Sequence, residues 1–586
     1  MSIYNLDKFK SLKKELCQKL NLILSWKRIG DLCASELQSG LPECVNLTQL
    51  NLQLEMNEIR NDGISEIINS IANCQKLEQI SINLSHNLIG VKGAQNLGIG
   101  LSLCPNVYDI SLNLNKNQIV QNGAIGICKG LAQCINLQNL QLILNNNSVQ
   151  DAGIYGLAQE LAKCQNLIKL NLSLKYNQIK NKGISNFGDE IVKFPKLMDL
   201  IITLEQNLIQ DEGIVYMSQK LGEHKILKLL NLDLYDNEFG DTGASGIGVG
   251  LSQSQSLKQL SLTLGKNKIT DLGISDCFQE LAICETISSI TLITSQLQIK
   301  DKGMKGIGDA LSQYSNLSTI YFNLYNNGIT DQGLSKFSQG LEICINLVNI
   351  SINLIQNNIG DKGIGSLSQK LPHLRYLTSL QLLLAKNKIQ KKGASSLGLS
   401  LSQCANLSSL QINLDENQLD QQAITDLTSN LANCTNLKAI SIDLYKSGVQ
   451  DKGVTGLGIG ISKIQSLVSL DLNLNSNSIR DQGVQSLIFG IAKCQNLCRL
   501  NLNLNMNEID DEGAGSLGQG LSQCQKLADL ILNIKYNKYN PEGQIQFAKG
   551  LRKCKRLKFL NLTISNQLNL NPVLFKILRL VLYKMN

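Results

Sequence analysis

A 30-residue period is the feature that most constrains how this chain can fold. Counted from Leu47 as position 0, an aliphatic residue recurs at this position in 18 consecutive copies, through Leu557, without an insertion or deletion. Position 3 is aliphatic in all 18 copies, and position 7 is aliphatic in every copy except at Thr294. A degenerate earlier copy starts near Cys17. A unit this short cannot bury its apolar side chains alone, so neighbouring copies must stack.

The spacing of apolar residues predicts a strand, a turn and a helix in each copy. Positions 3, 5 and 7 alternate with polar residues, as in residues 50–54, and this alternation is typical of a strand with one buried face. Positions 17, 20, 24 and 27 follow the spacing of a helix buried along one stripe, as in residues 64–74. Asp fills position 14 in ten copies, where we expect its carboxylate to cap the first helical N–H groups. The predicted fold is an α/β solenoid of about 19 repeats, with a parallel inner sheet and outer helices.

The motif LxxLxLxLxxNxI followed by DxGxxxLxxxLxxC resembles the ribonuclease-inhibitor-like leucine-rich repeat family over roughly residues 17 to 570. An extra Leu-x pair precedes the Asn in this chain, so we expect a strand about two residues longer than usual and a broader inner sheet. The resemblance implies a curved horseshoe that binds other proteins on its concave face. Because the family includes inhibitors, receptors and GTPase activators, the fold does not fix the function.

The repeat register also predicts how the chain is organised. Residues 1–46 should form an N-terminal cap and the degenerate first repeat, residues 47–556 the regular repeats, and residues 557–586 the last strand with a C-terminal capping helix. No run approaches the roughly 20 apolar residues that span a bilayer. The N-terminus has charges where a signal peptide has its apolar region, so we expect a cytoplasmic protein without a transmembrane segment.

Twelve of the 17 cysteines share position 27, and their shared register argues for a structural role. Large apolar residues take this position in other copies, as at Phe194, Tyr314, Leu374 and Ile464, so we expect it to be buried. Neighbouring helices lie about 8 to 10 Å apart, beyond the separation of up to about 7 Å that a disulfide tolerates. We therefore expect buried free thiols and a reducing compartment.

Catalytic and ligand-binding signatures are weak throughout the sequence. Asn fills position 10 in 15 of 17 copies, and such a ladder could bind sugar or nucleic acid, or satisfy backbone groups at a buried turn, which we favour. The chain has three His and no HExxH, GxSxG, P-loop or kinase signature. We therefore expect a protein that is not an enzyme, with no cofactor and no metal site.

Strand positions 4, 6 and 8 should face outward from the concave side, because they alternate with the buried residues. Only eight of these 54 side chains (18 copies of three) are charged, so we expect no nucleic acid on this face. Exposed aromatic residues are frequent anchors of protein interfaces. The residues that we expect to bind a protein partner are Asp233, Tyr235, Tyr321, Tyr325, Asp443 and Tyr445. The alternative is that these are scattered surface residues.

Charge gathers at the C-terminal end of the chain. Residues 541–586 contain nine Lys or Arg and one acidic residue, Glu542, a balance of plus 8. Four of these form a cluster just before the final strand, namely Arg552, Lys553, Lys555 and Arg556. We expect this basic cluster to dock an acidic partner, while the alternative is a solvated helix face.

Taken together, these features predict a protein-binding scaffold with a neutral concave face, a structural subunit of a large assembly. Heavy use of Asn, Gln, Lys and Ile is typical of AT-rich genomes such as those of ciliates, where related repeats occur in axonemal proteins. A cytoskeletal or ciliary location is therefore the narrower expectation. The rivals are a GTPase activator, whose relatives carry an acidic tail where this chain is basic, and a stand-alone inhibitor. The sequence specifies no partner and no oligomeric state.

Overall fold

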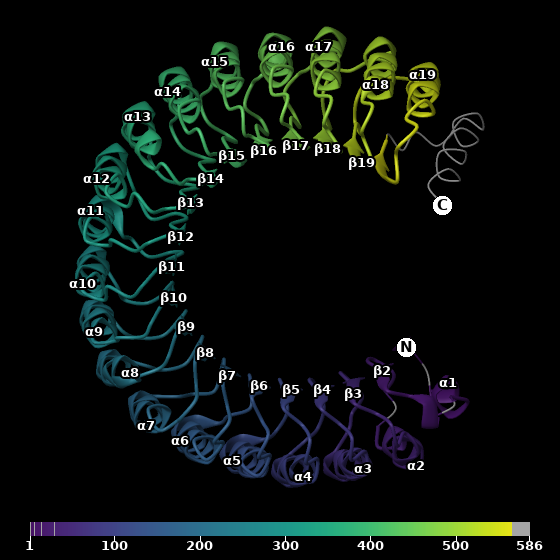
Figure 1. Cartoon of the computed structure of the whole chain (residues 1–586), viewed down its shortest axis with the longest axis vertical. Coiled ribbons are helices and arrows are strands. Elements are labelled where there is room, and N and C mark those ends of the chain that lie inside the picture. Colours follow the sequence, from purple (N-terminus) through teal and green to yellow (C-terminus); the bar gives the residue numbers. More distant parts are fainter. Residues whose placement is uncertain (1, 5, 13, 29, 565–586) are drawn as a thin grey trace. The chain divides into compact units, whose positions relative to one another are not determined.

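The structure is a computed structural model that describes residues 2–564 except residues 5, 13 and 29. The chain divides into two compact units, Met1–Leu297 and Gln298–Asn586. In each unit the same strand, turn and helix recur every 30 residues (Figure 1). The degenerate copy near Cys17 is a genuine repeat, because its strand pairs with the next one in the regular register.

The first unit begins with short elements and continues with regular repeats. Its strands are β1 Ser2–Ile3, β2 Lys19–Ile23, β3 Gln49–Gln53, β4 Gln79–Asn83, β5 Asp109–Asn113, β6 Asn139–Ile143, β7 Lys169–Ser173, β8 Asp199–Thr203, β9 Leu229–Asp233, β10 Gln259–Thr263 and β11 Ser289–Ile293. Its helices are α1 Leu6–Lys10, α2 Leu32–Gly40, α3 Asn61–Ala72, α4 Val91–Ser102, α5 Val120–Leu131, α6 Gln150–Leu161, α7 Asn181–Ile191, α8 Asp211–Glu223, α9 Asp241–Ser252 and α10 Asp271–Leu281, with 3-10 turns η1 Lys14–Leu16 and η2 Leu41–Glu43.

The second unit repeats this pattern from its first helix onward. Its helices are α11 Lys300–Leu311, α12 Asp331–Leu341, α13 Asp361–Lys370, α14 Lys391–Leu401, α15 Gln421–Leu431, α16 Gln450–Ile461, α17 Asp481–Ala492, α18 Asp511–Gln523 and α19 Pro541–Leu551, with the 3-10 turn η3 Leu371–His373. Its strands are β12 Thr319–Asn323, β13 Asn349–Asn353, β14 Ser379–Leu383, β15 Ser409–Asn413, β16 Ala439–Asp443, β17 Ser469–Asn473, β18 Arg499–Asn503, β19 Asp529–Asn533 and β20 Phe559–Thr563.

Within each unit the strands are parallel and pair in chain order. From β2 onward partner residues are 30 apart, as in the pairing of Leu50 with Ile80, while β1 pairs with β2 at Ser2 and Asn21. The backbone ladder continues past the end of each strand, because the N–H of position 7 donates to the next repeat, as from Leu54 N to Asn83 O at 2.8 Å. The same donation recurs at position 9 in most repeats. The paired stretch therefore extends beyond the five-residue strand. That the strand is longer than is usual in the family stays a prediction.

The core of each unit lies between the sheet and its helices. Positions 3, 5 and 7 are buried in repeat after repeat, and so is the helical stripe, which includes Ile64, Ile67 and Ile71 of α3. Figure 1 shows the helices on one side of the strands, so the other sheet face remains open. The predicted α/β solenoid is confirmed in each unit. Of residues 557–586 the structure includes β20, and the predicted capping helix lies outside the described residues. The domain boundaries at 46 and 556 stay a prediction.

The Asn residues at position 10 join neighbouring repeats. The Oδ1 of Asn87 accepts hydrogen bonds from Asn57 N at 3.1 Å and from Ile59 N at 2.9 Å. Its Nδ2 donates to Leu54 O at 3.0 Å and to Leu84 O at 2.9 Å. A third carbonyl, Ser85 O, lies 3.2 Å from Nδ2, so one side chain bonds five backbone groups at the buried turn, two N–H groups and three carbonyls. The backbone role that we favoured for this ladder is confirmed.

The Asp residues at position 14 also act between repeats, which corrects the sequence prediction. We expected each carboxylate to cap its own helix, but in nine of the ten copies, Asp271 being the exception, it accepts hydrogen bonds at the start of the next repeat's helix. Asp331 Oδ1 accepts from Gly360 N at 2.6 Å and from Gly363 N at 2.9 Å, at the start of α13. A Cβ added to Gly363 would lie 2.6 Å from that oxygen. Where the preceding repeat has Asp at position 14, its carboxylate fills the space that a side chain at position 16 would need. At Gly123, Gly153 and Gly453 an aliphatic side chain at position 12 comes closest instead.

The cysteines of position 27 lie where each helix ends. Eleven of the twelve are buried and all are free, while Cys554 is only half-buried, which corrects the prediction for that residue. Cys344 Sγ donates to Leu311 O at 3.1 Å, the carbonyl of the last residue of α11. Such carbonyls have no partner within their own helix, so the thiol supplies a donor across the repeat boundary. Burial raises the pKa of Cys344 to about 12, so this thiol is protonated at neutral pH.

The cap that crosses the repeat boundary can be tested at Asp331. Replacing Asp331 by Ala leaves the N–H groups of Gly360 and Gly363 without their acceptor, which should destabilise the second unit by about 1 to 2 kcal/mol. Asp331→Asn keeps an oxygen acceptor and should lower the free energy of unfolding less than Asp331→Ala does. Urea unfolding gives the stability, and hydrogen exchange of the two glycine amides gives the local effect. The neighbouring exposed substitution Gln332→Ala is the control, and an Asp331→Ala chain as stable as this control would disprove the role of the cap.

Candidate functional site

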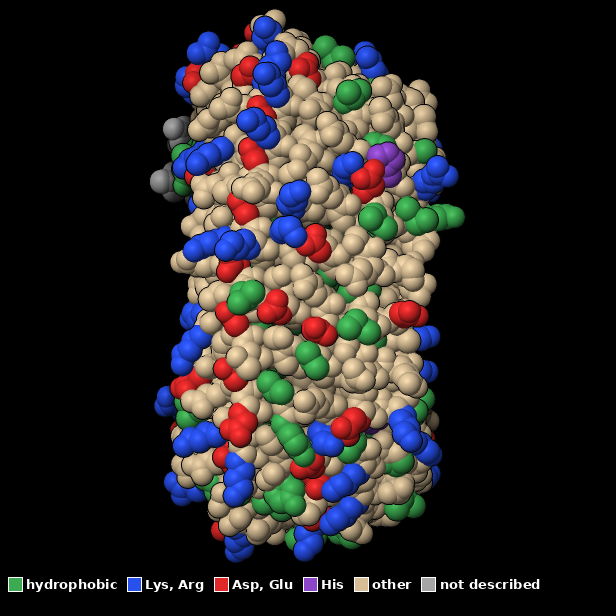
Figure 2. Space-filling model, turned by 90° about the vertical axis from the view of Figure 1, so that its left-hand side faces the viewer, with side chains coloured by type: hydrophobic (Ala, Val, Ile, Leu, Met, Phe, Trp, Pro, Cys, Tyr) green, Lys and Arg blue, Asp and Glu red, His purple; other side chains and the backbone are tan. Residues whose placement is uncertain are grey.

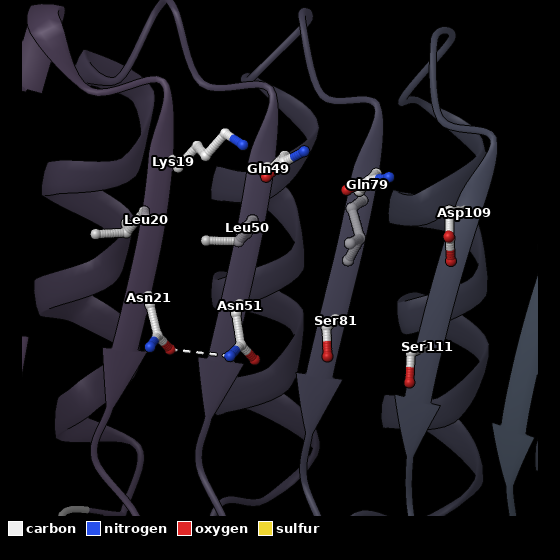
Figure 3. A pocket seen from close by; sticks show the side chains of 11 residues that line it. Lys19, Leu20, Asn21, Gln49, Leu50, Asn51, Gln79, Ser81, Asp109 and Ser111 are labelled. Atoms are coloured by element: carbon white, nitrogen blue, oxygen red, sulfur yellow. Dashed lines mark hydrogen bonds between the residues drawn. The ribbon is translucent and has the colours of Figure 1, made fainter. Parts of the chain in front are cut away.

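The open sheet face of the first unit contains a hollow of about 390 Å³ over β2 to β5. Its walls are the outward side chains of positions 2 and 4, among them Asn21, Asn51, Ser81 and Ser111 (Figure 3). Asn51 Nδ2 donates to Asn21 Oδ1 at 2.9 Å, so neighbouring amides partly satisfy one another. The hollow offers hydrogen-bonding groups for a polar ligand.

The second unit has a corresponding hollow of about 250 Å³ over β12 to β15. No charged side chain lines it, and one wall is Tyr321, whose side chain is 41% exposed. The other wall includes a chain of hydrogen bonds from Ser351 to Gln381 and from Gln381 Nε2 to Gln411 Oε1, the latter at 2.7 Å. Tyr321 is thus an exposed aromatic side chain beside a fixed, uncharged polar surface, which suits an interface anchor.

Asp233 and Tyr235, two of the predicted partner-binding residues, lie on the sheet face of the first unit. Asp233 Oδ1 accepts from Tyr235 N at 3.2 Å, and Lys175 Nζ lies 3.9 Å from the other carboxylate oxygen. Burial raises the pKa of Asp233, while the hydrogen bond and Lys175 oppose this shift. The ring of Tyr235 is half-buried against Gly265, and Lys266 Nζ lies 5.3 Å from its centroid. These contacts hold the ring in place, and Lys175 counters the acidic charge.

The other four predicted residues belong to the second unit and form two pairs. Tyr321 and Tyr325 lie on and just after β12, and Tyr325 is half-buried, with its hydroxyl donating to Gln356 Oε1 at 2.8 Å. Asp443 and Tyr445 lie at the end of β16, and Lys446 Nζ is 5.0 Å from the ring centroid of Tyr445. Strands β13 to β15 separate the two pairs. The predicted residues therefore do not form one compact site.

Asp233 and Asp443 share a structural role that sequence reasoning missed. At position 6 the side-chain oxygen accepts the N–H of position 8, as from Tyr445 N to Asp443 Oδ1 at 3.2 Å. Asn performs the same function in other repeats, as in the bond from Tyr325 N to Asn323 Oδ1 at 3.3 Å. The signal was present, because position 6 holds Asn in eight copies. One oxygen of each Asp is therefore occupied by the local turn.

A second feature missed from the sequence is an acidic diagonal made of Asp415, Asp443 and Asp471. These residues lie on three neighbouring repeats and are 28 residues apart in sequence. Because the repeat is 30 residues long, each Asp lies two positions earlier in its repeat than the one before, so the three form a diagonal across the sheet. Burial, a hydrogen bond with Asp443 and the charge of Asp443 raise the pKa of Asp415 to about 7. Burial also raises the pKa of Asp471. The 28-residue spacing could have revealed this line of carboxylates.

The basic cluster of Arg552, Lys553, Lys555 and Arg556 lies in the turn between α19 and β20. All four side chains are exposed, and none forms an ion pair with another described residue. The charge of the cluster is therefore available to an acidic group from outside.

The histidines, acidic groups and helices of the described residues form neither a metal site nor a membrane-spanning helix. The three histidines belong to different repeats: His224 is buried, and burial lowers its pKa, while His373 Nδ1 lies 3.0 Å from Glu342. Within residues 2–564, apart from the gaps, no group of three or more His, Cys, Asp or Glu could hold a metal ion. No described helix is both long and apolar enough to cross a membrane. On the surface shown in Figure 2, basic and acidic side chains are interspersed, as on a solvated face.

Comparisons with known proteins agree with the fold. A family model described as "Leucine Rich repeat" matches residues 227–248, 465–487 and 500–518. Among curated proteins, no sequence matches this chain. The architecture and these matches define a leucine-rich-repeat solenoid, while membership of the ribonuclease-inhibitor-like branch stays a prediction.

Three solved structures resemble the chain, each with 18% sequence identity. The match to a leucine-rich-repeat protein of Leptospira interrogans spans 94% of this chain and 98% of that protein's chain, with a TM-score of 0.39. The match to an internalin of Listeria monocytogenes spans 70% of this chain and 88% of the internalin chain, with a TM-score of 0.32. The match to TLR13, taken from its complex with ssRNA13, spans 82% of this chain and 70% of the TLR13 chain, with a TM-score of 0.37.

The acidic diagonal predicts a dependence of stability on pH. A carboxyl group has a pKa near 3.9 in an unfolded chain, and that of Asp415 is about 7 in the fold. The folded chain therefore holds this proton more tightly, and its stability falls as the pH rises from about 4 to about 7. Asp415→Asn cannot ionise, so it should raise the thermal midpoint at pH 8 and have little effect at pH 4. The control is Glu416→Gln, at the exposed next residue. An equal effect of Asp415→Asn at both pH values would contradict the raised pKa.

Proposed function

We propose that this chain is a non-enzymatic scaffold that binds a protein partner on its open sheet face. The observation that carries the proposal is Tyr321, an exposed aromatic side chain beside a rigid, uncharged hollow. Aromatic residues fixed on a rigid surface bind with little loss of side-chain entropy, because the side chain is already ordered. Tyr325 and Tyr445 extend the surface on the second unit, and Asp233 with Tyr235 supplies a separate contact on the first.

The charge pattern supports a protein partner over nucleic acid on this face. Polyanions are bound by clustered Lys and Arg, which release counterions. The sheet face of the second unit instead has the acidic diagonal of Asp415, Asp443 and Asp471. A partner with basic side chains near its apolar contact would complement this surface.

The basic cluster provides a second contact, with an acidic partner such as the surface of a filament or a neighbouring subunit. A scaffold with two separate contact surfaces suits a structural subunit of a large assembly. A cytoplasmic place, within a cytoskeletal or ciliary assembly, is the narrower form of the proposal and rests on sequence composition and the free thiols.

Removal of the aromatic anchors tests the binding face. Partners captured by the parent chain and identified by mass spectrometry would be purified and measured by calorimetry. The double substitution Tyr321→Ala and Tyr325→Ala should weaken binding at least about thirtyfold, because a buried aromatic anchor contributes about 2 kcal/mol or more. Tyr321→Ala alone should leave the thermal midpoint nearly unchanged, since Tyr321 is exposed, whereas Tyr325→Ala also loses the hydrogen bond to Gln356 and should lower it slightly.

Tyr376 is the matched control for this experiment. It belongs to the same unit and is 59% exposed, but it lies between η3 and β14 rather than on the sheet face. Tyr376→Ala should leave the affinity unchanged. If the double substitution binds as tightly as Tyr376→Ala, the interface lies elsewhere.

A further inference from the structure

The segment that leads from each helix into the next strand changes sharply in charge along the second unit. In the last four repeats these segments are residues 462–469, 492–499, 522–529 and 552–559. They contain nine basic residues and one acidic residue, Asp529, a balance of plus 8. We call the nine residues the basic strip: Lys463, Lys493, Arg499, Lys526, Arg552, Lys553, Lys555, Arg556 and Lys558. The five preceding segments of the unit, starting at 312, contain two basic and one acidic residue together, a balance of plus 1.

The side chains of the strip are exposed and mostly uncompensated. All nine side chains are exposed to solvent. Arg499 pairs with Asp529 at 3.2 Å, and Lys526 Nζ donates to the neutral Asn496 Oδ1 at 2.7 Å. For the other seven, the described part of the chain supplies no carboxylate partner. The strip therefore presents an uncompensated positive surface.

The fold places these charges on four neighbouring repeats. The four segments enter β17, β18, β19 and β20, which pair side by side in that order. Figure 1 shows these neighbouring strands with α17, α18 and α19 beside them. Paired strands are about 4.8 Å apart and neighbouring helices about 8 to 10 Å. Three repeat steps therefore span about 14 Å where the segments enter the strands and about 24 to 30 Å where they leave the helices, the position of Lys463 and Lys493. The four-residue cluster is thus one end of a longer surface that sequence reasoning did not connect.

We propose that the basic strip binds an extended acidic segment of a partner protein, with Lys463 and Lys493 contacting it beyond the cluster. This inference rests on the docking role proposed for the cluster and specifies the shape and charge of what docks. Carboxylates are favoured because each of the four segments offers at least one Lys or Arg. Single-stranded nucleic acid also needs aromatic stacking platforms, and the described strip segments expose one, Phe559. Insertion into a membrane needs a contiguous apolar face, and the large apolar side chains that these segments expose are Val468 and Phe559, which lie in the first and the last of the four segments.

Synthetic peptides of three and ten glutamates test the length of the surface. The parent chain should bind decaglutamate with an affinity that falls at least about tenfold between low and physiological salt. The double substitution Lys463→Gln and Lys493→Gln should weaken decaglutamate binding about fivefold and leave triglutamate binding unchanged. Changing Arg552, Lys553, Lys555 and Arg556 to Gln should weaken both. The control is Lys391→Gln with Lys392→Gln, two exposed lysines at the start of α14, which should change neither.

Circular dichroism first checks that every variant is folded. The binding results then distinguish the proposal of an extended strip from the docking role of the cluster alone. If decaglutamate binding depends on the cluster but not on Lys463 and Lys493, the proposal of an extended strip is wrong, and the docking role of the cluster remains. If neither peptide binds the parent chain at low salt, both proposals fail. If polyuridylate or phosphatidylserine vesicles bind tighter than decaglutamate, with the same dependence on the strip, the partner is not an acidic protein segment.

Discussion

Hydrogen bonds from the side chain of one repeat to the backbone of its neighbour are the interaction on which this structure depends. Asn357 Oδ1 accepts from Asn327 N at 3.2 Å and from Ile329 N at 2.9 Å, while its Nδ2 donates to Leu324 O at 3.0 Å. The carboxylate caps of position 14 and the thiols of position 27 also act across repeat boundaries. A single repeat would leave these buried groups unpaired, which costs about 1 to 3 kcal/mol for each group. The strict 30-residue register follows, because an insertion would separate donors from acceptors.

This constraint decides where functional information can lie. Apolar and bridging positions are fixed by the fold, so variation is left to the outward strand positions, the helical surface and the segments between helix and strand. Position 6 is partly fixed too, since its oxygen closes the local turn, and this explains why Asp443 is less informative than its charge suggested. Tyr321, Asp415 and Lys463 occupy positions that the fold leaves free. Their chemistry is therefore better evidence of binding.

The regular architecture could be predicted from sequence because each buried position repeats in many copies. Alternation at positions 3, 5 and 7 predicted the strand, and the stripe containing Ile64 predicted the helix. The direction of the Asp cap could not be predicted, since a carboxylate near a helix start has donors in two repeats within reach. Position 9 adopts a left-handed backbone conformation in most repeats, with φ of 53° at Met56 and 55° at Tyr176, yet no glycine marks it. The acidic diagonal and the basic strip arise between repeats, where reading one copy at a time shows nothing.

The dependence of each repeat on its neighbours is tested most directly by removing one whole repeat. Deletion of residues 347–376 would bring Asn387 into the place of Asn357 and preserve the register. Hydrogen exchange of the Asn327 and Ile329 amides reports whether the new neighbour satisfies them. If contact between neighbours is what stabilises the repeats, both amides stay protected and the second unit still folds. Loss of protection throughout the second unit would contradict this expectation, because stability would then depend on that particular repeat rather than on contact between neighbours.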